Sequence, residues 1–326
     1  MKLSGPIFIA GLERTGTSLL YALLASHPSI AMTRRTNWWT FFYDRYGDLG
    51  RDDNLDRILA DMRRYRRHRK LELDFDRLHR DLVTGDRSYC RLFALMQGQH
   101  AERTGRPRWG DKSLHTERYA ERVYGCFPEA RIIHIIRDPR DRYASVLKRW
   151  RSKRGGVGSA TAAWLASVEL AATNRERYPD RYRVLEYEAL VRDPEVTMRS
   201  ICDFIGEPYE PAMLEMTGAS EFRETGGNSS YGKFAAGEIS PRSVGRFRSV
   251  LSDRQVAFVQ RTAGPTMAQH GYEPVPLQMS AGDRLQYRAL TVPANAAKMA
   301  LWRLRERFYD VTGRAPPTDT LLDDKR

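Results

Sequence analysis

The first twenty residues constrain the fold more strongly than any other stretch of the chain. Residues 6–10 form a short apolar run with the length of a buried strand, and residues 19–24 have the length and composition of a helix. The loop between them, residues 11–18, reads Gly-x-x-x-x-Gly-Thr-Ser, which is the spacing of a phosphate-binding loop except that Thr17 replaces the lysine. The alternative is an ordinary strand–turn–helix connection with conveniently placed glycines.

The missing lysine decides which chemistry this loop can support. The backbone N–H groups of such a loop, together with the positive end of the following helix, hold a phosphate whatever the side chains are. In an NTPase the lysine reaches the β- and γ-phosphates and supports transfer of the terminal group. Without that lysine the loop can still hold one phosphate but is poorly equipped for ATP or GTP hydrolysis, and Arg14 offers a replacement charge inside it. We therefore expect a nucleotide whose phosphate carries something other than a phosphoryl chain.

The composition indicates a globular protein with a basic surface. The 326 residues are 41% hydrophobic and 29% charged, enough for one large α/β domain or two smaller ones. Lys and Arg number 54 against 41 Asp and Glu, for a net charge of +13. This excess favours anionic ligands but does not choose between a nucleotide, a sulfated polymer, nucleic acid and lipid headgroups.

The cysteines and the apolar runs bear on the compartment. Cys90, Cys126 and Cys202 are scattered, odd in number and form no CxxC pair. We therefore expect neither a disulfide framework nor a zinc site, and a reducing environment. The apolar run before Gly11 is too short for a signal peptide, and no stretch has the length of a membrane span, so the sequence predicts a soluble, cytoplasmic protein.

Two further strands complete the predicted sheet. Residues 131–136 are apolar almost throughout, as in a parallel sheet covered on both faces, and His134 among them is interpreted as a core histidine. A third strand is predicted at residues 182–187. Since ligands of open α/β sheets bind at the carboxyl ends of the strands, the loop at 11–18 and the segment after residue 136 should lie at the same edge.

The segment after residue 136 carries a second candidate anion site. Arg137 leaves the strand and is followed by Asp-Pro-Arg-Asp, and a helix is predicted from about Tyr143. Ser145 and Arg149 lie four residues apart and therefore share one face of that helix. A guanidinium, a hydroxyl and a second arginine in this arrangement suit an anion.

Other segments leave alternatives open. Residues 38–43 contain five aromatic side chains, which suit either core packing or a wall for an adenine or an acceptor. The basic run at 63–70 suits either a solvated helix face or a docking patch for an acidic acceptor. Residues 109–115, with several ionisable groups, are predicted to be a loop that precedes a helix at 117–124.

Together these segments resemble the nucleotide-binding signatures of sulfotransferases that use 3′-phosphoadenosine 5′-phosphosulfate (PAPS), in particular bacterial members related to the tyrosyl-protein and carbohydrate branch. Residues 11–20 resemble the family's loop for the 5′-phosphosulfate, and residues 137–141 with Ser145 resemble its 3′-phosphate segment. Similar runs occur at positions 111–115, 183–191, 243–247 and 271–272. The resemblance covers about residues 5 to 275 in the family's order.

The resemblance implies a fold, a reaction and a domain arrangement. The fold would be a P-loop-like three-layer α/β structure with a short central parallel sheet flanked by helices. It would occupy residues 1–277, with a helical insertion at about 37–105, and residues 278–326 would form a C-terminal helical extension containing a helix at 294–309. The reaction would be in-line transfer of the sulfuryl group of PAPS to a hydroxyl, without a metal ion, releasing 3′,5′-adenosine bisphosphate. The acceptor would be a carbohydrate, a lipid, a small molecule or a peptide tyrosine; no nucleic-acid partner is expected, and a homo-oligomer is left open.

The resemblance also implies roles for particular residues. The residues expected to hold the donor are Arg14, Thr15, Gly16, Thr17 and Ser18 for the 5′-phosphosulfate, and Arg137, Ser145 and Arg149 for the 3′-phosphate, with Tyr187 and Arg246 supporting. Lys112 aligns with the lysine that, in the tyrosyl-protein branch, neutralises the bridging oxygen as the bond to sulfur breaks. Arg14 and Lys112 would thus supply the charge that the loop lysine and a metal would otherwise supply.

The catalytic base of that branch has no counterpart in this sequence. The branch has a glutamate shortly after a His-Pro pair like the one at residues 27–28, where this chain reads Thr-Arg-Arg-Thr at 33–36. His115 is the first candidate base, because an imidazole suits accepting a hydroxyl proton near neutral pH. Glu13 is the second and Asp111 the third. Alternatively, His115 caps a helix, Glu13 pairs with a basic neighbour of the loop, and Asp111 orients a lysine.

Two other functions are open from the sequence. One is an ATP- or GTP-dependent phosphotransferase with a degenerate loop, in which Asp138 would hold magnesium and Lys112 would meet the phosphates. The other is a non-catalytic nucleotide-binding protein, which the missing glutamate and the basic surface favour.

Overall fold

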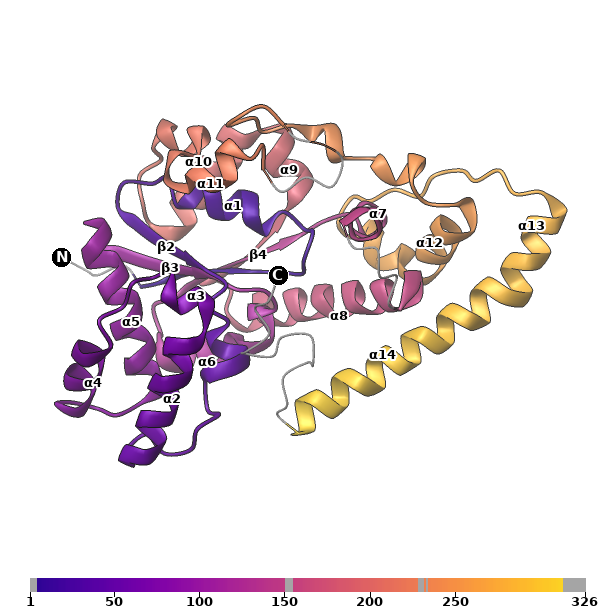
Figure 1. Cartoon of the computed structure of the whole chain (residues 1–326). Coiled ribbons are helices and arrows are strands. Elements are labelled where there is room, and N and C mark those ends of the chain that lie inside the picture. Colours follow the sequence, from indigo (N-terminus) through magenta and orange to yellow (C-terminus); the bar gives the residue numbers. More distant parts are fainter. Residues whose placement is uncertain (1–4, 150–154, 228–231, 233, 313–326) are drawn as a thin grey trace.

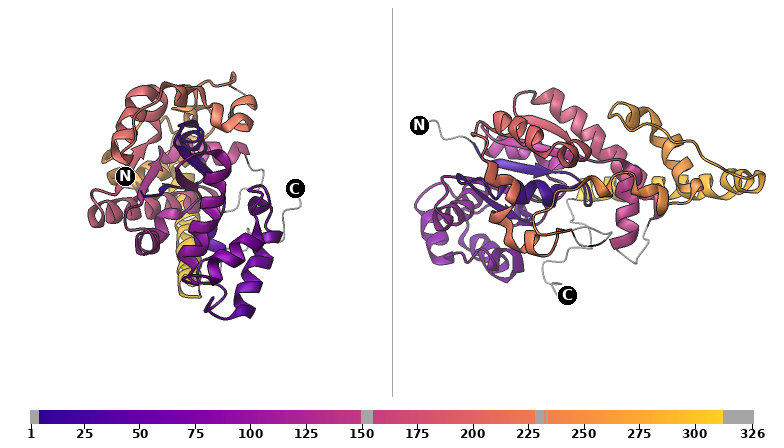
Figure 2. Two further views of the ribbon diagram at one scale, coloured as in Figure 1. Left: turned by 90° about the vertical axis from the view of Figure 1, so that its left-hand side faces the viewer. Right: turned by 90° about the horizontal axis from the view of Figure 1, so that it is seen from above.

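A five-stranded parallel sheet forms the centre of the molecule (Figure 1). The computed structural model describes residues 5–149, 155–227, 232 and 234–312. The strands are β1 (Ile7–Ala10), β2 (Ile30–Arg34), β3 (Arg108–Lys112), β4 (Arg131–Ile136) and β5 (Tyr182–Glu186), in the spatial order β2-β3-β1-β4-β5. Helices cover both faces of this sheet (Figures 1 and 2), which confirms the three-layer α/β prediction.

Strand β1 is buried on both sides, as its continuous apolar sequence predicts. Ile7 and Ile9 belong to a core cluster formed with helices α1 (Thr17–Leu24), α9 (Tyr187–Arg192) and α10 (Pro194–Ile205). Phe8 and Ala10 belong to the cluster on the opposite face. Because its side chains alternate between the two cores, β1 is packed on both sides up to the point where the loop begins.

The opposite face is covered by the segment between β2 and β3 and by the helix after β3. Its elements are η1 (Trp38–Phe42), α2 (Asp52–Arg64), α3 (Arg66–Arg69), α4 (Phe75–Val83), α5 (Tyr89–Thr104), η2 (Thr116–Tyr119) and α6 (Ala120–Cys126). Four of the five η1 side chains are buried in this core, so the core-packing interpretation of the aromatic segment is confirmed. His134 is also a core residue, with its Nδ1 2.7 Å from the Tyr182 hydroxyl and its Nε2 3.0 Å from that of Ser167.

Strands β2 and β3 were not expected, and the prediction of a loop at 109–115 is wrong for residues 109–112. The polar sequence of β3 is tolerated inside the sheet because two of its charged side chains, Arg108 and Asp111, have partners. Arg108 donates to the carbonyl oxygens of Gly5 and Ile205, both at 2.7 Å, and forms an ion pair of 2.9 Å with Glu207. The Asp111 carboxylate accepts hydrogen bonds from the hydroxyls of Ser113 and Thr33. No local pattern in the sequence predicts that distant segments will supply these partners.

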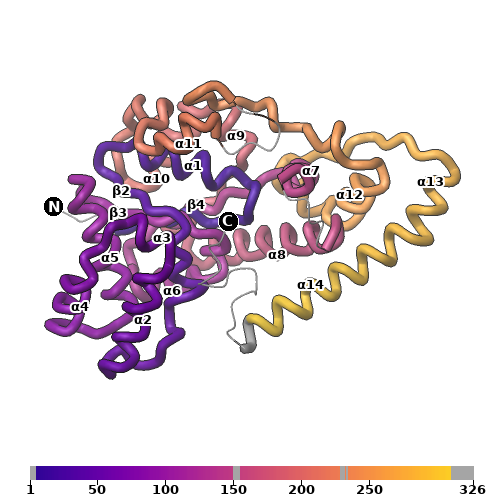
Figure 3. Tube along the Cα trace, viewed as in Figure 1, coloured from indigo at the N-terminus to yellow at the C-terminus, as the bar shows by residue number. Residues whose placement is uncertain are grey.

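The remaining elements of the fold are α7 (Pro139–Arg149), α8 (Gly156–Arg177), η3 (Pro211–Glu215), η4 (Thr217–Ala219), α11 (Ser220–Glu224), η5 (Pro241–Ser243), η6 (Arg246–Ser249), α12 (Asp253–Ala268), α13 (Ala281–Gln286), η7 (Tyr287–Thr291) and α14 (Val292–Thr312). Elements η3, η4 and α11 pack beside α1, whereas α12 and α13 extend beyond one end of the sheet (Figure 2). Helix α13 lies at the far end, and the long helix α14 runs back along α8 (Figure 3). The helix predicted at 294–309 lies within α14. The proposed domain boundaries stay a prediction, and residues 313–326 lie outside the described residues.

The cysteines correct one prediction. Cys90 at the start of α5 and Cys126 at the end of α6 form a disulfide, with their Cα atoms 5.2 Å apart, while Cys202 is free and buried. The packing of α5 beside α6 brings the two thiols together across 36 residues, a separation that carries no spacing signal. The expectation of no disulfide is therefore wrong, and the cysteines give no ground for a reducing compartment. None of the helices in the described ranges is both long and apolar enough to cross a bilayer.

Candidate active site

The loop after β1 has a conformation that requires its glycines. Gly11 and Gly16 have φ values of 132° and 106°, a region that other residues rarely adopt. A Cβ on Gly16 would lie 2.4 Å from the ring of Tyr187, so the loop passes in contact with the start of α9. Beneath the loop, the buried carboxylate of Glu117 accepts a hydrogen bond of 3.0 Å from the Gly11 N–H. Sequence reasoning did not identify this support, because Glu117 lies 106 residues further along the chain.

The two predicted anion-binding segments meet at the carboxyl edge of the sheet. Arg14 Nε donates to Ser145 Oγ at 2.9 Å, and Arg137 Nη1 donates to the carbonyl oxygen of Arg14 at 3.3 Å. The Arg137 guanidinium lies 4.4 Å from the centroid of the Tyr187 ring, in a cation–π contact. The Tyr187 and Ser243 hydroxyls are 2.7 Å apart. Side chains from four separate segments therefore surround one space.

This space is a cleft with about 690 Å³ of empty volume, open solvent included, which we call the donor cleft. Its polar lining consists of Arg14, Gly16, Thr17, Ser18, Arg137, Ser145, Tyr187, Glu238, Ser240 and Ser243. Its apolar lining includes Phe222 and Phe234, which no sequence signal identified. Arg137 is buried and forms no direct ion pair with a carboxylate among the described residues; its Nη2 donates to the Ser243 carbonyl oxygen at 2.7 Å, and its Nε lacks a hydrogen-bond partner there. A buried guanidinium without a carboxylate partner beside a glycine loop fits a nucleotide that carries two separate anionic groups.

A second cleft, the basic cleft, adjoins the donor cleft and shares Ser18, Phe222 and Gly227 with it. Its cationic lining consists of Arg34, Arg35, Arg66, Arg67, Lys70, Lys112 and Arg149. Among the described lining residues one carboxylate faces these cations, that of Glu221, which forms an ion pair with Arg34. The cleft therefore carries a large excess of positive charge.

The basic run at 63–70 divides between its two predicted roles. Arg63 and Arg64 are exposed, as a solvated helix face requires. Arg66, Arg67 and Lys70 line the basic cleft, as a docking patch requires. The division follows from a break in the helix at residue 65, where α2 ends and the short helix α3 begins in a new direction.

Lys112, the last residue of β3, is the most perturbed cation of the basic cleft. It is 3% exposed, and burial, reinforced by the nearby Arg35 guanidinium, lowers its pKa from the usual 10.5 to about 7. Its neighbour Asp111 is fully buried, and burial raises the pKa of that carboxyl to about 6, although Ser113 and Thr33 donate hydrogen bonds of 2.8 and 2.9 Å to it. At neutral pH Lys112 is therefore poised between its charged and neutral forms.

The candidate bases lie away from the clefts. Glu13 forms an ion pair with Arg142, whose Nε also donates to the Glu13 carbonyl oxygen at 3.1 Å. His115 immediately precedes η2 in a left-handed conformation, and its Nδ1 lies 3.9 Å from Glu117 Oε1. Neither residue, nor Asp111, lines the donor cleft or the basic cleft.

Three predicted donor-binding residues occupy other positions. Thr15 is buried and donates to the Leu12 carbonyl oxygen at 2.8 Å, so its side chain stabilises the loop from within. Arg246 is exposed and lines neither cleft. Arg149 lies one helical turn beyond Ser145 on α7, as predicted, but it lines the basic cleft. The roles of all three stay predictions.

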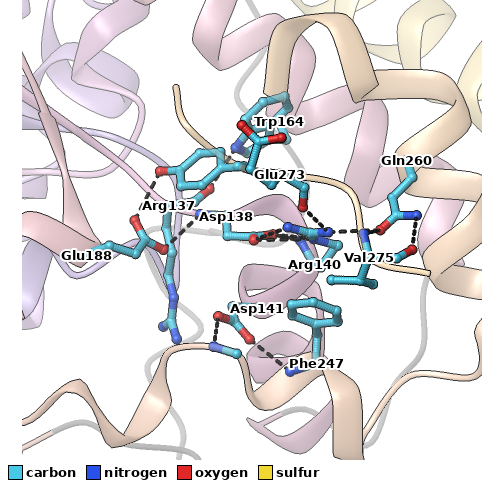
Figure 4. Close-up of polar contacts among 12 residues, drawn as sticks. Arg137, Asp138, Arg140, Asp141, Trp164, Glu188, Phe247, Gln260, Glu273 and Val275 are labelled. Atoms are coloured by element: carbon cyan, nitrogen blue, oxygen red, sulfur yellow. Dashed lines mark hydrogen bonds and ion pairs between the residues drawn. The ribbon is translucent and has the colours of Figure 1, made fainter. Parts of the chain in front are cut away.

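Asp138, the candidate magnesium ligand of the rival function, is engaged in a structural network (Figure 4). Arg140 Nη2 donates to its Oδ2 at 2.7 Å and Arg140 Nε to its Oδ1 at 3.0 Å. Glu188 accepts the Asp138 backbone N–H at 3.1 Å, and Asp141 accepts the Phe247 N–H at 2.8 Å. This carboxylate is already neutralised by a buried arginine, so the geometry does not favour the phosphotransferase.

Comparison with known proteins gives a consistent result. A family model described as the sulfotransferase family matches residues 6–211. Protein-tyrosine sulfotransferase A of Caenorhabditis elegans is 26% identical over 217 residues, which are 64% of this chain and 51% of that protein. The protein-tyrosine sulfotransferase of Drosophila melanogaster is 27% identical over 220 residues, 64% of this chain and 39% of that protein. The chain thus spans about half, or less, of the length of these curated relatives.

Two solved structures have the same fold. The sulfotransferase domain of the Synechococcus PCC 7002 olefin synthase superposes with a TM-score of 0.57 and 22% identity, over 83% of this chain and 95% of that domain. The sulfotransferase domain from the curacin biosynthetic pathway gives a TM-score of 0.54 and 21% identity, over 84% of this chain and the whole of that domain. At this level of identity the likeness establishes the fold, which is the P-loop-like α/β fold predicted from the sequence.

Proposed function

This chain belongs to the sulfotransferase family, and on that premise we propose that it transfers the sulfuryl group of PAPS to a hydroxyl acceptor by in-line displacement. One observation carries the proposal: the contact between Arg14 and Ser145, which unites the two anion-binding segments in a single cleft. The basic cleft that adjoins it supplies a second binding region, as a two-substrate transfer requires.

In the donor cleft, the proposed role of the chain is to hold two anionic groups at fixed positions. The loop N–H groups, with Arg14, Thr17 and Ser18, would hold the 5′-phosphosulfate, and Arg137 and Ser145 the 3′-phosphate. The donor, when bound, supplies the sulfuryl group. Stacking on Tyr187 and hydrogen bonds to the carbonyl oxygens of Arg14 and Ser243 keep the Arg137 guanidinium in place.

Lys112 is proposed to stabilise the charge that develops on the leaving bridging oxygen. An anion beside a buried lysine favours its protonated form, so donor binding would raise the pKa of Lys112 above 7. A preorganised ammonium of this kind stabilises the transition state more than the ground state, because the charge on the bridging oxygen grows as the bond to sulfur breaks.

The acceptor is proposed to carry anionic groups close to its hydroxyl. The cations of the basic cleft outnumber its single carboxylate, and electrostatic complementarity favours a negatively charged partner. A tyrosine flanked by acidic residues is the first candidate, since the curated relatives are named protein-tyrosine sulfotransferases. Sulfated or carboxylated carbohydrates and anionic small molecules have the same chemistry.

The proton acceptor is to be assigned by substitution of His115→Gln, Glu13→Gln and Asp111→Asn. Loss of the base should lower kcat and leave the affinity for adenosine bisphosphate unchanged, because the donor cleft does not contain these side chains. A variant that loses both kcat and the affinity for adenosine bisphosphate has a disrupted loop, so its loss of activity does not identify the base.

The first test of the proposal is a thermal shift with 3′,5′-adenosine bisphosphate and, separately, with ATP and magnesium. At a hundred times its dissociation constant a ligand stabilises the fold by about 2.7 kcal/mol, which is readily measured. The bisphosphate should stabilise the wild type and the control Arg199→Ala, an exposed arginine on α10, but not Arg137→Ala. Stabilisation by ATP and magnesium alone would support the phosphotransferase, and no response to either ligand would refute the proposal. Bisphosphate binding without transfer to any acidic acceptor would support a non-catalytic protein.

A further inference from the structure

Helix α14 has two different faces, and its inner face packs against the rest of the protein. On the inner face Asn295 and Met299 are buried against α8. Asn295 Oδ1 accepts a hydrogen bond of 3.1 Å from the Gly158 N–H, and Glu306 forms an ion pair of 2.5 Å with Arg118. These contacts fix the orientation of α14 along the body of the protein (Figure 1).

The outer face of α14 is apolar and exposed. Leu301 and Leu304 are 68% and 63% exposed, and Leu290, in the helical turn that leads into α14, is 60% exposed. Ala294 and Ala297, also exposed, lie between them. The spacing of 4, 3, 4 and 3 residues places all five on one stripe, opposite the face that packs on α8. Packing among the described residues does not explain why these apolar side chains lie on one continuous exposed stripe.

Cations flank the stripe on both sides. At 100° per residue, Lys298 and Arg305 lie along one edge of the stripe and Arg307 along the other, and all three are exposed; Arg303, also exposed, lies closer to the inner face. Glu306, the one acidic residue of the sequence between positions 292 and 309, is turned inward to Arg118. The outer surface of this part of the helix therefore combines an apolar stripe with positive charge only.

We propose that the outer face of α14 binds an anionic lipid surface. A helix with leucines on one side and lysines and arginines beside them lies in the plane of a membrane interface, with its apolar stripe in the headgroup–acyl boundary and its cations at the anionic headgroups. A second copy of the chain is a poorer occupant, because pairing two such faces would bring the cationic edges of both helices together with no carboxylate between them. Charge complementarity thus selects the lipid surface.

The inference is tested by sedimentation of the full chain with vesicles. The wild type should bind vesicles of equimolar phosphatidylcholine and phosphatidylserine, and should not bind vesicles of phosphatidylcholine alone. Leu301→Gln with Leu304→Gln should lower the partition coefficient by about tenfold or more, because the leucines no longer enter the boundary. The triple change Lys298→Gln, Arg305→Gln and Arg307→Gln should lower it by about 100-fold, since each basic residue near an anionic surface contributes about 1 kcal/mol. Val196→Gln, which removes an exposed valine on α10 that is not part of the stripe, is the matched control and should bind like the wild type.

Several outcomes would overturn the inference. Absence of binding to the mixed vesicles at low salt does so directly, as does equal binding by the wild type and the leucine variant. Chromatography that shows a dimer, converted to a monomer by the leucine changes while vesicle binding is absent, would assign the face to a second copy. The bisphosphate thermal shift, measured on the same samples, should be equal in all variants; this readout separates failure of the membrane inference from failure of the proposed function.

Discussion

Replacement of Lys112 by methionine should stabilise the ligand-free protein while it slows sulfuryl transfer. Lys112 is almost fully buried at the end of β3, and burial lowers its pKa from 10.5 to about 7. Methionine keeps an unbranched side chain of similar length and removes the charge. The ligand-free variant therefore no longer carries the unfavourable burial of an ammonium group. The wild type needs that charge only when the donor is bound.

The pH dependence gives this effect a size and a sign. Between pH 7 and pH 10.5 the unfolded chain binds a proton at Lys112 that the folded protein has released, so the free energy of unfolding rises with pH in this window. From pH 7 to pH 9 this one group adds about 2 kcal/mol to the wild type and nothing to the variant. At pH 7 the variant should be the more stable protein, by on the order of 4 kcal/mol at most. Part of this gain is offset because Asp111 loses the neighbouring charge that favours its ionisation.

The assay is urea unfolding of the two proteins at pH 7, 8 and 9. Other titrating groups cancel in the difference between the wild type and Lys112→Met, so this difference reports on Lys112. It should shrink by about 2 kcal/mol across the series. Lys148→Met, at an exposed lysine of α7, is the control and should give a small difference that does not change with pH.

A difference that is constant from pH 7 to pH 9 would refute the assignment of a buried, partly neutral Lys112. Kinetics test the second half of the prediction: kcat of Lys112→Met should fall much more than the affinity for adenosine bisphosphate. If kcat is retained, Lys112 does not act on the bridging oxygen, whatever its pKa.

Three further predictions follow from single contacts. Gly16→Ala should abolish the bisphosphate thermal shift, because a Cβ there would lie 2.4 Å from the Tyr187 ring and the φ of 106° disfavours alanine; a normal shift would show that the loop can relax. Cys90→Ser should lower the free energy of unfolding by about 4 kcal/mol, which is the loop-entropy value for a separation of 36 residues. Dithiothreitol should lower the melting temperature of the wild type but not that of this variant. Asp111→Asn should remove a loss of about 2 kcal/mol that the wild type shows as the pH rises from 4 to 6, because in this window the unfolded chain releases a proton that the folded state largely retains. An unchanged profile in urea unfolding would contradict the raised pKa.

The donor cleft was largely predictable from the sequence because each of its parts is local. The loop at 11–18 and the segment from Arg137 to Ser145 each follow a strand with a continuous apolar pattern. Strands β1 and β4 are neighbours in a parallel sheet, so their carboxyl ends, and the residues that follow them, lie at one edge. The contact between Arg14 and Ser145 is the consequence.

Strand β3 could not be predicted in the same way. Pattern reasoning assigns polar residues to the surface, whereas Arg108, Asp111 and Lys112 are buried and the first two receive partners from distant segments. The partners of Arg108 and Asp111 satisfy two of the strand's three charges, and these partners are contributed by the tertiary structure. The interpretation of residues 109–112 as a loop failed for this reason.

The sequence by itself determined the parallel α/β core, the glycine loop at residues 11–18 and the family resemblance, because these depend on short contiguous patterns of apolar residues, glycines and arginines. Only the tertiary structure decided the basic cleft, the pKa of Lys112, the Cys90–Cys126 disulfide and the exposed stripe of α14. The physical reason is the same for all four. Burial and long-range proximity set the dielectric around a charge, the distance between two thiols and the exposure of a helix face, and none of these is fixed until the distant segments of the chain have packed.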